Sequence, residues 1–260
     1  MVHMNDKGPV VGAGKKKVSW ARRIAIFAVG GALLAILVAM VATTLARYGV
    51  VSKLGGFGVF MQMMYVAGAS AAIGVVALIL AAIRRSSGRK TAILAIVLSL
   101  GLVGVIYALV INPARSHPPL HDITTDLNDP PQFRTLTLRE DNLVPFASEE
   151  EWRAAHRNGY PDIEPIIIDR APEEVLANAR ALAEERGWEI AAYDAASGHM
   201  EATAYAGYIR FMDDVVVEVT PVQDGSTRVD MRSVSRVGVS DLGYNAARIE
   251  EFLADLREAE

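Results

Sequence analysis

Three long segments without a charged side chain constrain this chain more than any other feature. They cover residues 24–45, 59–83 and 92–111. Each is about 20 residues or longer, which is enough for a helix to cross roughly 30 Å of hydrocarbon. Because apolar side chains occur all round each segment, burial in a soluble core is the weaker alternative. The sequence therefore predicts three transmembrane helices.

Basic residues flank the three spans unevenly. The strongly basic flanks are the N-terminus (Lys15, Lys16, Lys17, Arg22 and Arg23) and the turn between the second and third spans (Arg84, Arg85, Arg89 and Lys90). The stretch after the third span has only Arg115. Cytoplasmic flanks are enriched in Lys and Arg, so we expect a cytoplasmic N-terminus over residues 1–23 and an extracytoplasmic C-terminal part. In a bacterium with two membranes, this describes a multi-pass inner-membrane protein with a periplasmic domain.

The first basic flank also resembles the start of a signal peptide. The apolar run that follows is longer than the 7 to 15 residues typical of a cleaved signal, which favours an uncleaved anchor. Whether this span is ever removed is left open.

Charge divides the chain near Asn112. Residues 1–111 contain 12 Lys and Arg and one acid, whereas residues 112–260 contain 14 basic and 29 acidic residues, giving +11 and −15. An acidic domain is repelled by phosphate at long range, which argues against nucleic acid as a partner. The absence of cysteine excludes disulfides, thiolate nucleophiles and cysteine-ligated metals.

The spans themselves favour an anchor over a transport path. No ionisable side chain lies within them, although a permeating ion or proton normally needs one at depth. Small residues at four-residue spacing, Ser70 with Gly74 and Gly68 with Ala72, favour close helix packing instead. The bilayer is therefore the one certain partner, an envelope protein is a further candidate, and the oligomeric state is open.

The exported part divides into an extended segment and a folded domain. Residues 112–147 begin with five prolines in 20 residues, which predicts a stiff extended strap that leads away from the membrane and forbids a continuing helix. Residues 148–260 predict an α+β domain, a small antiparallel sheet with helices on one face. The predicted helices and strands are helices 149–158, 172–186 and 244–258 and strands 166–168, 188–193, 199–205, 211–220 and 227–237, bounded by caps and hairpin turns.

A resemblance appears in the C-terminal part. It is carried by Phe211-Met-Asp-Asp-Val-Val-Val-Glu-Val, by the run from Val229 to Ile249 with its Arg-Ser-Val-Ser-Arg-Val-Gly-Val-Ser-Asp-Leu-Gly core, and by Tyr160-Pro-Asp-Ile-Glu-Pro. These motifs resemble the DUF1499 family over roughly residues 118–258. The resemblance implies a membrane or envelope protein, and it implies no catalytic residue.

Two arginines on the last strand form the first candidate site. Alternation places Arg232 and Arg236 on one face. With Asp213, Asp214 or Glu218 from the neighbouring strand, they would form cross-strand ion pairs on a solvated face. The functional alternative is an arginine pair that binds a carboxylate or phosphate ligand.

Two further groups of residues are weaker candidates. Asp241 precedes the last helix and is predicted to cap it, although free N–H groups there could bind an anion. His121, Asp122 and Asp126, with His117 nearby, combine imidazole and carboxylate in a possible metal set, but their spacing matches no tight metal motif. Capped turns in a Pro-rich loop explain the two aspartates equally well, and no cofactor is expected.

These observations leave the biochemical role open between two classes. Motifs for a nucleophile elbow, a zinc protease helix or a phosphate-binding loop are absent from the sequence, so we expect a non-enzymatic domain that binds a partner protein or a small ligand in the cell envelope. The alternative is an extracytoplasmic enzyme with a polar site on the face around Arg232 and Arg236. A deep polar pocket there would favour the enzyme, and a flat face rimmed with apolar residues would favour the binding module.

Overall fold

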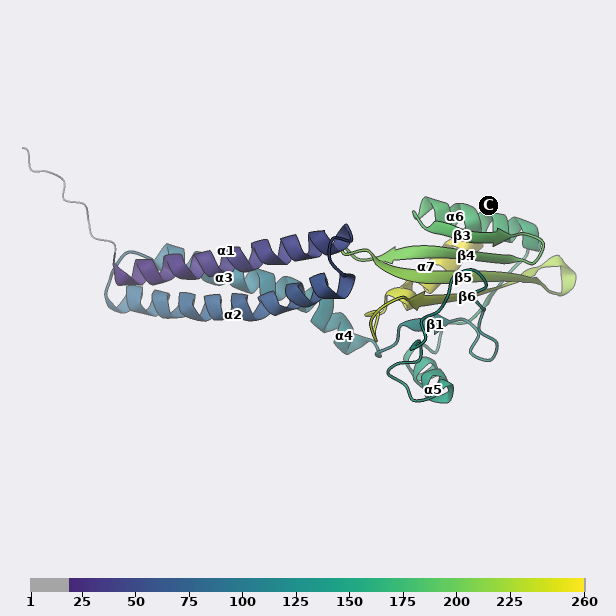
Figure 1. Cartoon of the computed structure of the whole chain (residues 1–260), viewed down its shortest axis with the longest axis horizontal. Coiled ribbons are helices and arrows are strands. Elements are labelled where there is room, and N and C mark those ends of the chain that lie inside the picture. The colour runs from purple at the N-terminus through teal and green to yellow at the C-terminus, as the bar shows by residue number, and fades with distance from the viewer. Residues whose placement is uncertain (1–18, 260) are drawn as a thin grey trace, which may run out of the picture. The chain divides into compact units, whose positions relative to one another are not determined.

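The computed structural model describes residues 19–259 (Figure 1). Lys15–Lys17 and most of the predicted cytoplasmic N-terminus therefore lie outside the described residues. Three helical stretches are long and apolar enough to cross a membrane: α1 (Trp20–Arg47), α2 (Lys53–Ile83) and the stretch Arg89–Ser116. The three predicted spans are confirmed as helices, and each helix extends several residues beyond its uncharged segment.

The third stretch continues past the point where the prolines were expected to end it. It comprises α3 (Arg89–Ile106), a π-helical turn (Tyr107–Ile111) and α4 (Asn112–Ser116). Pro113 lies in the first turn of α4, where a missing backbone N–H costs nothing. The N–H of Asn112 donates to the carbonyl of Tyr107, five residues back. The prediction that Pro113 ends the helix is therefore wrong, because a helix tolerates proline in a first turn.

One compact unit contains the described residues up to Ile36 together with Met64–Val103. Small residues allow its helices to approach closely. A Cβ atom on Gly31 would lie 2.4 Å from the Ser70 hydroxyl, and one on Gly74 would lie 3.0 Å from Ile96. Ser70 and Gly74 thus pack as predicted, whereas a Cβ on Gly68 would meet open space in the described structure.

The second compact unit contains Leu37–Met63 and the described residues from Gly104 onward. Its centre is an antiparallel sheet with the strand order β1-β6-β5-β4-β3, and β2 also pairs with β6. The strands are β1 (Asp122–Thr124), β2 (Ile166–Ile168), β3 (Glu189–Asp194), β4 (His199–Ala206), β5 (Phe211–Pro221) and β6 (Thr227–Ser235). All were predicted except β1, a three-residue strand inside the Pro-rich segment.

Helices cover one face of this sheet (Figure 1). They are α6 (Pro172–Glu185) and α7 (Tyr244–Glu258), while α5 (Glu149–Gly159) lies near β1 and begins where Ser148 Oγ accepts the N–H of Glu151 at 3.2 Å. The apolar core between sheet and helices includes Leu176, Met231 and Phe252. The predicted α+β class with helices on one face is confirmed.

Of the predicted strap, residues 125–147 cover the opposite face of the sheet. From here on, the name strap refers to residues 125–147 only. The strap starts beside β6, where the Thr125 N–H donates to the Met231 carbonyl at 2.9 Å. It reaches β4, where the Arg134 N–H donates to Glu201 at 2.6 Å. The segment predicted as a spacer over residues 112–147 therefore contributes a helix and a strand and then folds back over the sheet.

Candidate functional site

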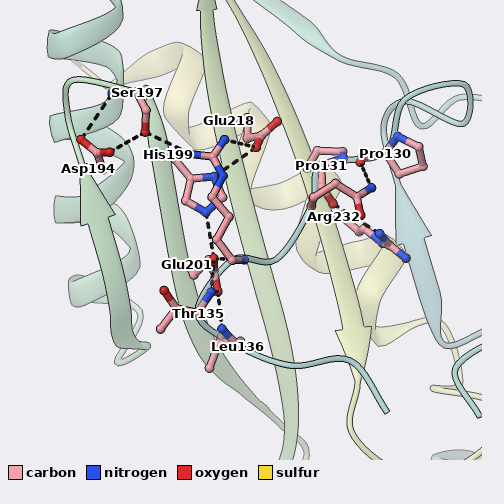
Figure 2. Close-up of polar contacts among 12 residues, drawn as sticks. Pro130, Pro131, Thr135, Leu136, Asp194, Ser197, His199, Glu201, Glu218 and Arg232 are labelled. Atoms are coloured by element: carbon pink, nitrogen blue, oxygen red, sulfur yellow. Dashed lines mark hydrogen bonds and ion pairs between the residues drawn. The ribbon is translucent and has the colours of Figure 1, made fainter. Parts of the chain in front are cut away.

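The face of the sheet beneath the strap is polar. Alternating side chains of β4, β5 and β6 point toward the strap, and Arg236, just after β6, continues the pattern. The polar ones in the strands are His199, Glu201, Thr203, Asp214, Glu218, Asp230 and Arg232. The start of β5 and the end of β6 lie near the strap's Arg139. Figure 2 shows part of this face, where the strap crosses β4 and β5. The arginines that the sequence singles out as a candidate site lie here.

Arg232 is buried in a closed ion pair. Its Nε and Nη2 donate to the two carboxylate oxygens of Asp122 at 2.9 and 2.7 Å, and its Nη1 donates to the Pro131 carbonyl at 3.3 Å. Asn142 Nδ2 also donates to Asp122 at 2.5 Å. The guanidinium is thus already engaged in paired N–H donation to a carboxylate of the protein itself.

This arrangement corrects two details of the prediction. The partner of Arg232 is Asp122 of β1 and not a residue of β5. In the register of β1 and β6, Asp122 lies opposite Val234, two residues from Arg232 on the same face of the sheet. The pair is also buried and not solvated, since Arg232 is only 7% exposed beneath the strap.

Arg236 lies farther along the same face, toward its open end. Its Nε and Nη2 donate to Asp214 at 2.7–3.0 Å, and Nη2 donates to Thr203 at 2.9 Å. A small pocket of about 160 Å³ adjoins Arg236 and Asp214 and is also lined by Thr137, Leu138 and Arg139 of the strap. Arg232 does not line this pocket, so the two arginines do not converge on one ligand site.

Asp213 faces the helices, on the other side of the sheet from Asp214. It accepts a hydrogen bond from Arg248 Nη2 of α7 at 2.6 Å. The five candidate residues of the sequence therefore divide into two groups, with Arg232, Arg236 and Asp214 under the strap and Asp213 and Asp241 near the start of α7.

Glu201 fixes the strap to the sheet (Figure 2). Its fully buried carboxylate accepts the backbone N–H groups of Arg134, Thr135 and Leu136 at 2.6–3.2 Å and lies 2.8 Å from His199 Nε2. Burial alone would raise the pKa of Glu201, but these hydrogen bonds lower it below its ordinary value. A carboxylate with this many internal donors has little capacity left for a substrate, so its role is to hold the strap.

The candidate metal ligands are directed to separate partners. Asp122 pairs with Arg232, Asp126 pairs with Arg228 at 2.7 Å, and His121 Nε2 accepts from Arg139 Nη2 at 2.7 Å. Burial, and then the charge of Arg139, lower the pKa of His121. Within residues 19–259 no group of three or more His, Asp or Glu side chains is placed to hold a metal ion.

A large cavity lies in the second compact unit and has a volume of about 900 Å³. Its wall comes from the C-terminal end of α1, the N-terminal end of α2, the π-helical turn, the β4–β5 turn and residues 237–244. Most of its lining is apolar, with Phe57, Leu109, Ile209 and Val239 as examples. Its volume lies within the range of about 300–1,000 Å³ that is typical of small-molecule sites.

Three polar residues in the lining of this cavity are buried: Asp213, Ser235 and Asp241. Asp241 accepts the N–H groups of Gly243 and Asn245 at 2.9 and 2.6 Å. It thus satisfies an N–H of the first turn of α7, although Gly243 and not Asp241 is the N-cap residue. Burial raises the pKa of Asp241. These groups are therefore satisfied within the protein, and the cavity offers a mainly apolar surface to a ligand.

The β4–β5 turn is held against the helix ends by specific contacts. Arg47 Nη1 donates to the Tyr208 carbonyl at 2.9 Å, and Lys53 Nζ donates to the Ile209 carbonyl at 2.9 Å. The rings of Phe57 and Phe211 meet edge to face at 6.0 Å. Sequence reasoning missed this site, although an unusual apolar hairpin turn, Tyr-Ile-Arg-Phe, was its visible signal.

Fold and site together define a class: an α+β domain that follows three helices able to span a membrane and shares an apolar cavity with their ends. Residues 122–256, more than half of the chain, match the model of the family described as "Protein of unknown function (DUF1499)". The chain belongs to this family, as the sequence motifs indicated. No match is found among curated proteins.

Proposed function

We propose that this protein is a membrane-anchored binding module that holds the hydrocarbon chain of a membrane lipid. The observation that carries the proposal is the apolar cavity of about 900 Å³ that the helix ends and the sheet domain build together. A hydrocarbon chain is the ligand that such a lining suits, because removing apolar surface from water contributes about 25 cal/mol per Å².

The exposure of the cavity wall supports a ligand from the membrane. Leu54, Leu109 and Val239 are 50%, 61% and 49% exposed, although they line one continuous hollow. Large exposed apolar patches mark ligand grooves or membrane contacts. The first two of these residues belong to helices that are long and apolar enough to span a membrane, which supports a ligand drawn from the bilayer.

The same proposal includes the orientation of the protein. Arg84, Arg85, Arg89 and Lys90 between the second and third helices favour a cytoplasmic position for that turn. The domain then lies on the extracytoplasmic side, which in a bacterium with two membranes is the periplasmic side of the inner membrane.

The face around Arg232 and Arg236 gives less support to an enzyme. The arginines are paired with Asp122 and Asp214, and the pocket beside Arg236 holds about 160 Å³. This is below the volume range of typical small-molecule sites.

Lipid retention in the purified full chain tests the proposal. Lipids that remain after detergent exchange would be extracted and quantified by mass spectrometry. We expect stoichiometric lipid in the wild type and strongly reduced lipid in Val237→Trp, which fills the cavity. Val222→Trp, on the exposed β5–β6 connection, is the matched control and should retain lipid.

Two results would contradict the proposal. One is a wild-type protein that retains no lipid after mild exchange. The other is a Val237→Trp variant that folds with an unchanged thermal transition and retains as much lipid as the control.

A further inference from the structure

Three cations lie together at the rim of the apolar cavity. Arg47 and Lys53 donate to the adjacent carbonyls of Tyr208 and Ile209, and the next residue is Arg210. Thr44, Leu54, Tyr208 and Ile209, which neighbour these cations along the chain, line the cavity. The positive cluster and the apolar hollow are therefore parts of one surface.

These three cations form no ion pair with an acid among the described residues. The acid placed near Arg210 is Glu189, which accepts a hydrogen bond from the hydroxyl of Tyr205, the ring on which Arg210 stacks. None of the ion pairs within residues 19–259 includes Arg47, Lys53 or Arg210. Residues 37–63 contain no Asp or Glu. The two acids closest in sequence to Arg210, Asp213 and Asp214, are paired with Arg248 and Arg236. Three like charges at close range repel one another, and a bound anion would relieve that repulsion.

The three side chains are equipped for different parts of anion binding. Lys53 Nζ donates to three backbone carbonyls, those of Ala46, Arg47 and Ile209, so it supplies charge but no free N–H. Arg47 donates only through Nη1 in the described structure, and its guanidinium lies 5.0 Å from the centre of the Tyr208 ring. The Arg210 guanidinium stacks 3.9 Å from the centre of the Tyr205 ring. Arg47 and Arg210 therefore retain N–H groups for a ligand.

A structural explanation covers part of this arrangement. Lys53 binds the last carbonyls of α1, where a cation is favourable at a helix C-terminus. This role of Lys53 does not explain why Arg47 and Arg210 lie beside it without forming an ion pair, in a chain whose C-terminal domain is rich in acids. A guanidinium that is planar and forked matches phosphate oxygens well.

We infer that the ligand of the cavity is a phospholipid whose phosphate binds Arg47 and Arg210 while its hydrocarbon chain occupies the cavity. This inference rests on the proposed function and adds the chemistry of the head group. The domain as a whole is acidic, but charges farther away than about 10 Å are largely screened at 0.1 M salt. The local cluster then dominates the interaction with a phosphate at the rim.

The test compares two lipids with the same chains. Phosphatidylglycerol carries an anionic phosphodiester, and diacylglycerol carries none. Binding of each to the full chain in detergent would be titrated by native mass spectrometry. We expect phosphatidylglycerol to bind the wild type more tightly, and Arg47→Gln/Arg210→Gln to weaken it about tenfold or more, since charge-assisted hydrogen bonds are lost. Diacylglycerol binding should change little.

The control is Arg157→Gln/Arg257→Gln, which removes the same charge from two exposed arginines that form no ion pair in the described structure. It should leave both affinities unchanged. Equal loss of phosphatidylglycerol in both double variants would overturn the inference, because the effect would then follow net charge alone.

The outcomes separate this inference from the proposed function. If both lipids bind the wild type equally and Val237→Trp weakens both, the cavity binds hydrocarbon and the phosphate inference fails. If neither lipid binds, both fail. Displacement of phosphatidylglycerol by millimolar inorganic phosphate alone would indicate a simple anion site and overturn the assignment to a lipid.

Discussion

At the scale of single residues, the domain is notable for charged groups that are buried with a partner. Asp122 and Arg232 are 1% and 7% exposed and form a bidentate pair. Such a pair contributes little net stability relative to apolar residues, but removal of one partner leaves an uncompensated buried charge. The consequence is an asymmetry between single and double substitutions.

Asp122→Asn should therefore destabilise the domain by about 3–5 kcal/mol. Asp122→Leu/Arg232→Met should be less destabilised than the single variant. The measurement is denaturant unfolding of the full chain in detergent, followed by the fluorescence of Trp152 and Trp188, which lie in the domain core. A single variant within about 1 kcal/mol of wild type would show that the pair is not buried as described.

His156 predicts a specific dependence of stability on pH. Burial lowers its pKa to about 4, and its Nε2 accepts the Thr124 N–H at 3.1 Å. Below about pH 6.5, His156 is protonated in the unfolded chain, whereas in the folded chain it stays neutral until about pH 4. The free energy of unfolding should therefore fall over this interval as the pH is lowered, by up to about 3 kcal/mol from this group.

His156→Gln keeps an acceptor for the Thr124 N–H and removes the titration. We expect the variant to lose less stability than the wild type between pH 6.5 and 4, in thermal unfolding at several pH values. Its curve should still slope, because the pKa of Glu201 is lowered and its contribution is lost at acid pH. An identical slope in both proteins would contradict the assignment.

At the scale of elements, one carboxylate holds the middle of the strap. Its backbone N–H groups at residues 134–136 converge on the single carboxylate of Glu201. Glu201→Gln replaces an acceptor oxygen by an amide donor. We expect hydrogen exchange at these amides to accelerate at least about tenfold, measured by mass spectrometry, with exchange in β5 nearly unchanged.

Glu184→Gln is the matched control, because Glu184 forms an exposed pair with Arg180 on α6. It should leave exchange in the strap unchanged. If Glu201→Gln also left it unchanged, the strap would be held by contacts other than this carboxylate.

The sequence predicted the elements better than it predicted their partners. Hydrophobic periodicity and turn residues located α5, α6, α7 and five strands, because each of these signals is local. β1 and the path of the strap were missed, since three residues between prolines carry no periodicity and their position depends on pairing with β6, more than 100 residues later. Alternation placed Arg232 and Arg236 on one face, but β1 supplied the partner of Arg232.

At the scale of the whole molecule, the cavity joins the ends of the apolar helices to the acidic domain within the second compact unit. Its wall combines Phe57 of α2 with Ile209 and Val239 of the domain. These residues are far apart in the chain, so the apolar β4–β5 turn alone does not predict the site. The proposed ligand has to contact both groups at once.

Crosslinking of a lipid chain tests this central claim most directly. The full chain would be reconstituted with a phospholipid that carries a photoreactive group near the end of one acyl chain, and the labelled residues would be mapped by mass spectrometry. The account predicts labels on domain residues of the cavity wall, such as Ile209 and Val239, that are lost in Val237→Trp. Labels confined to exposed helix positions such as Ile26, Leu34 and Ile79 would show that lipid only surrounds the helices, and would contradict it.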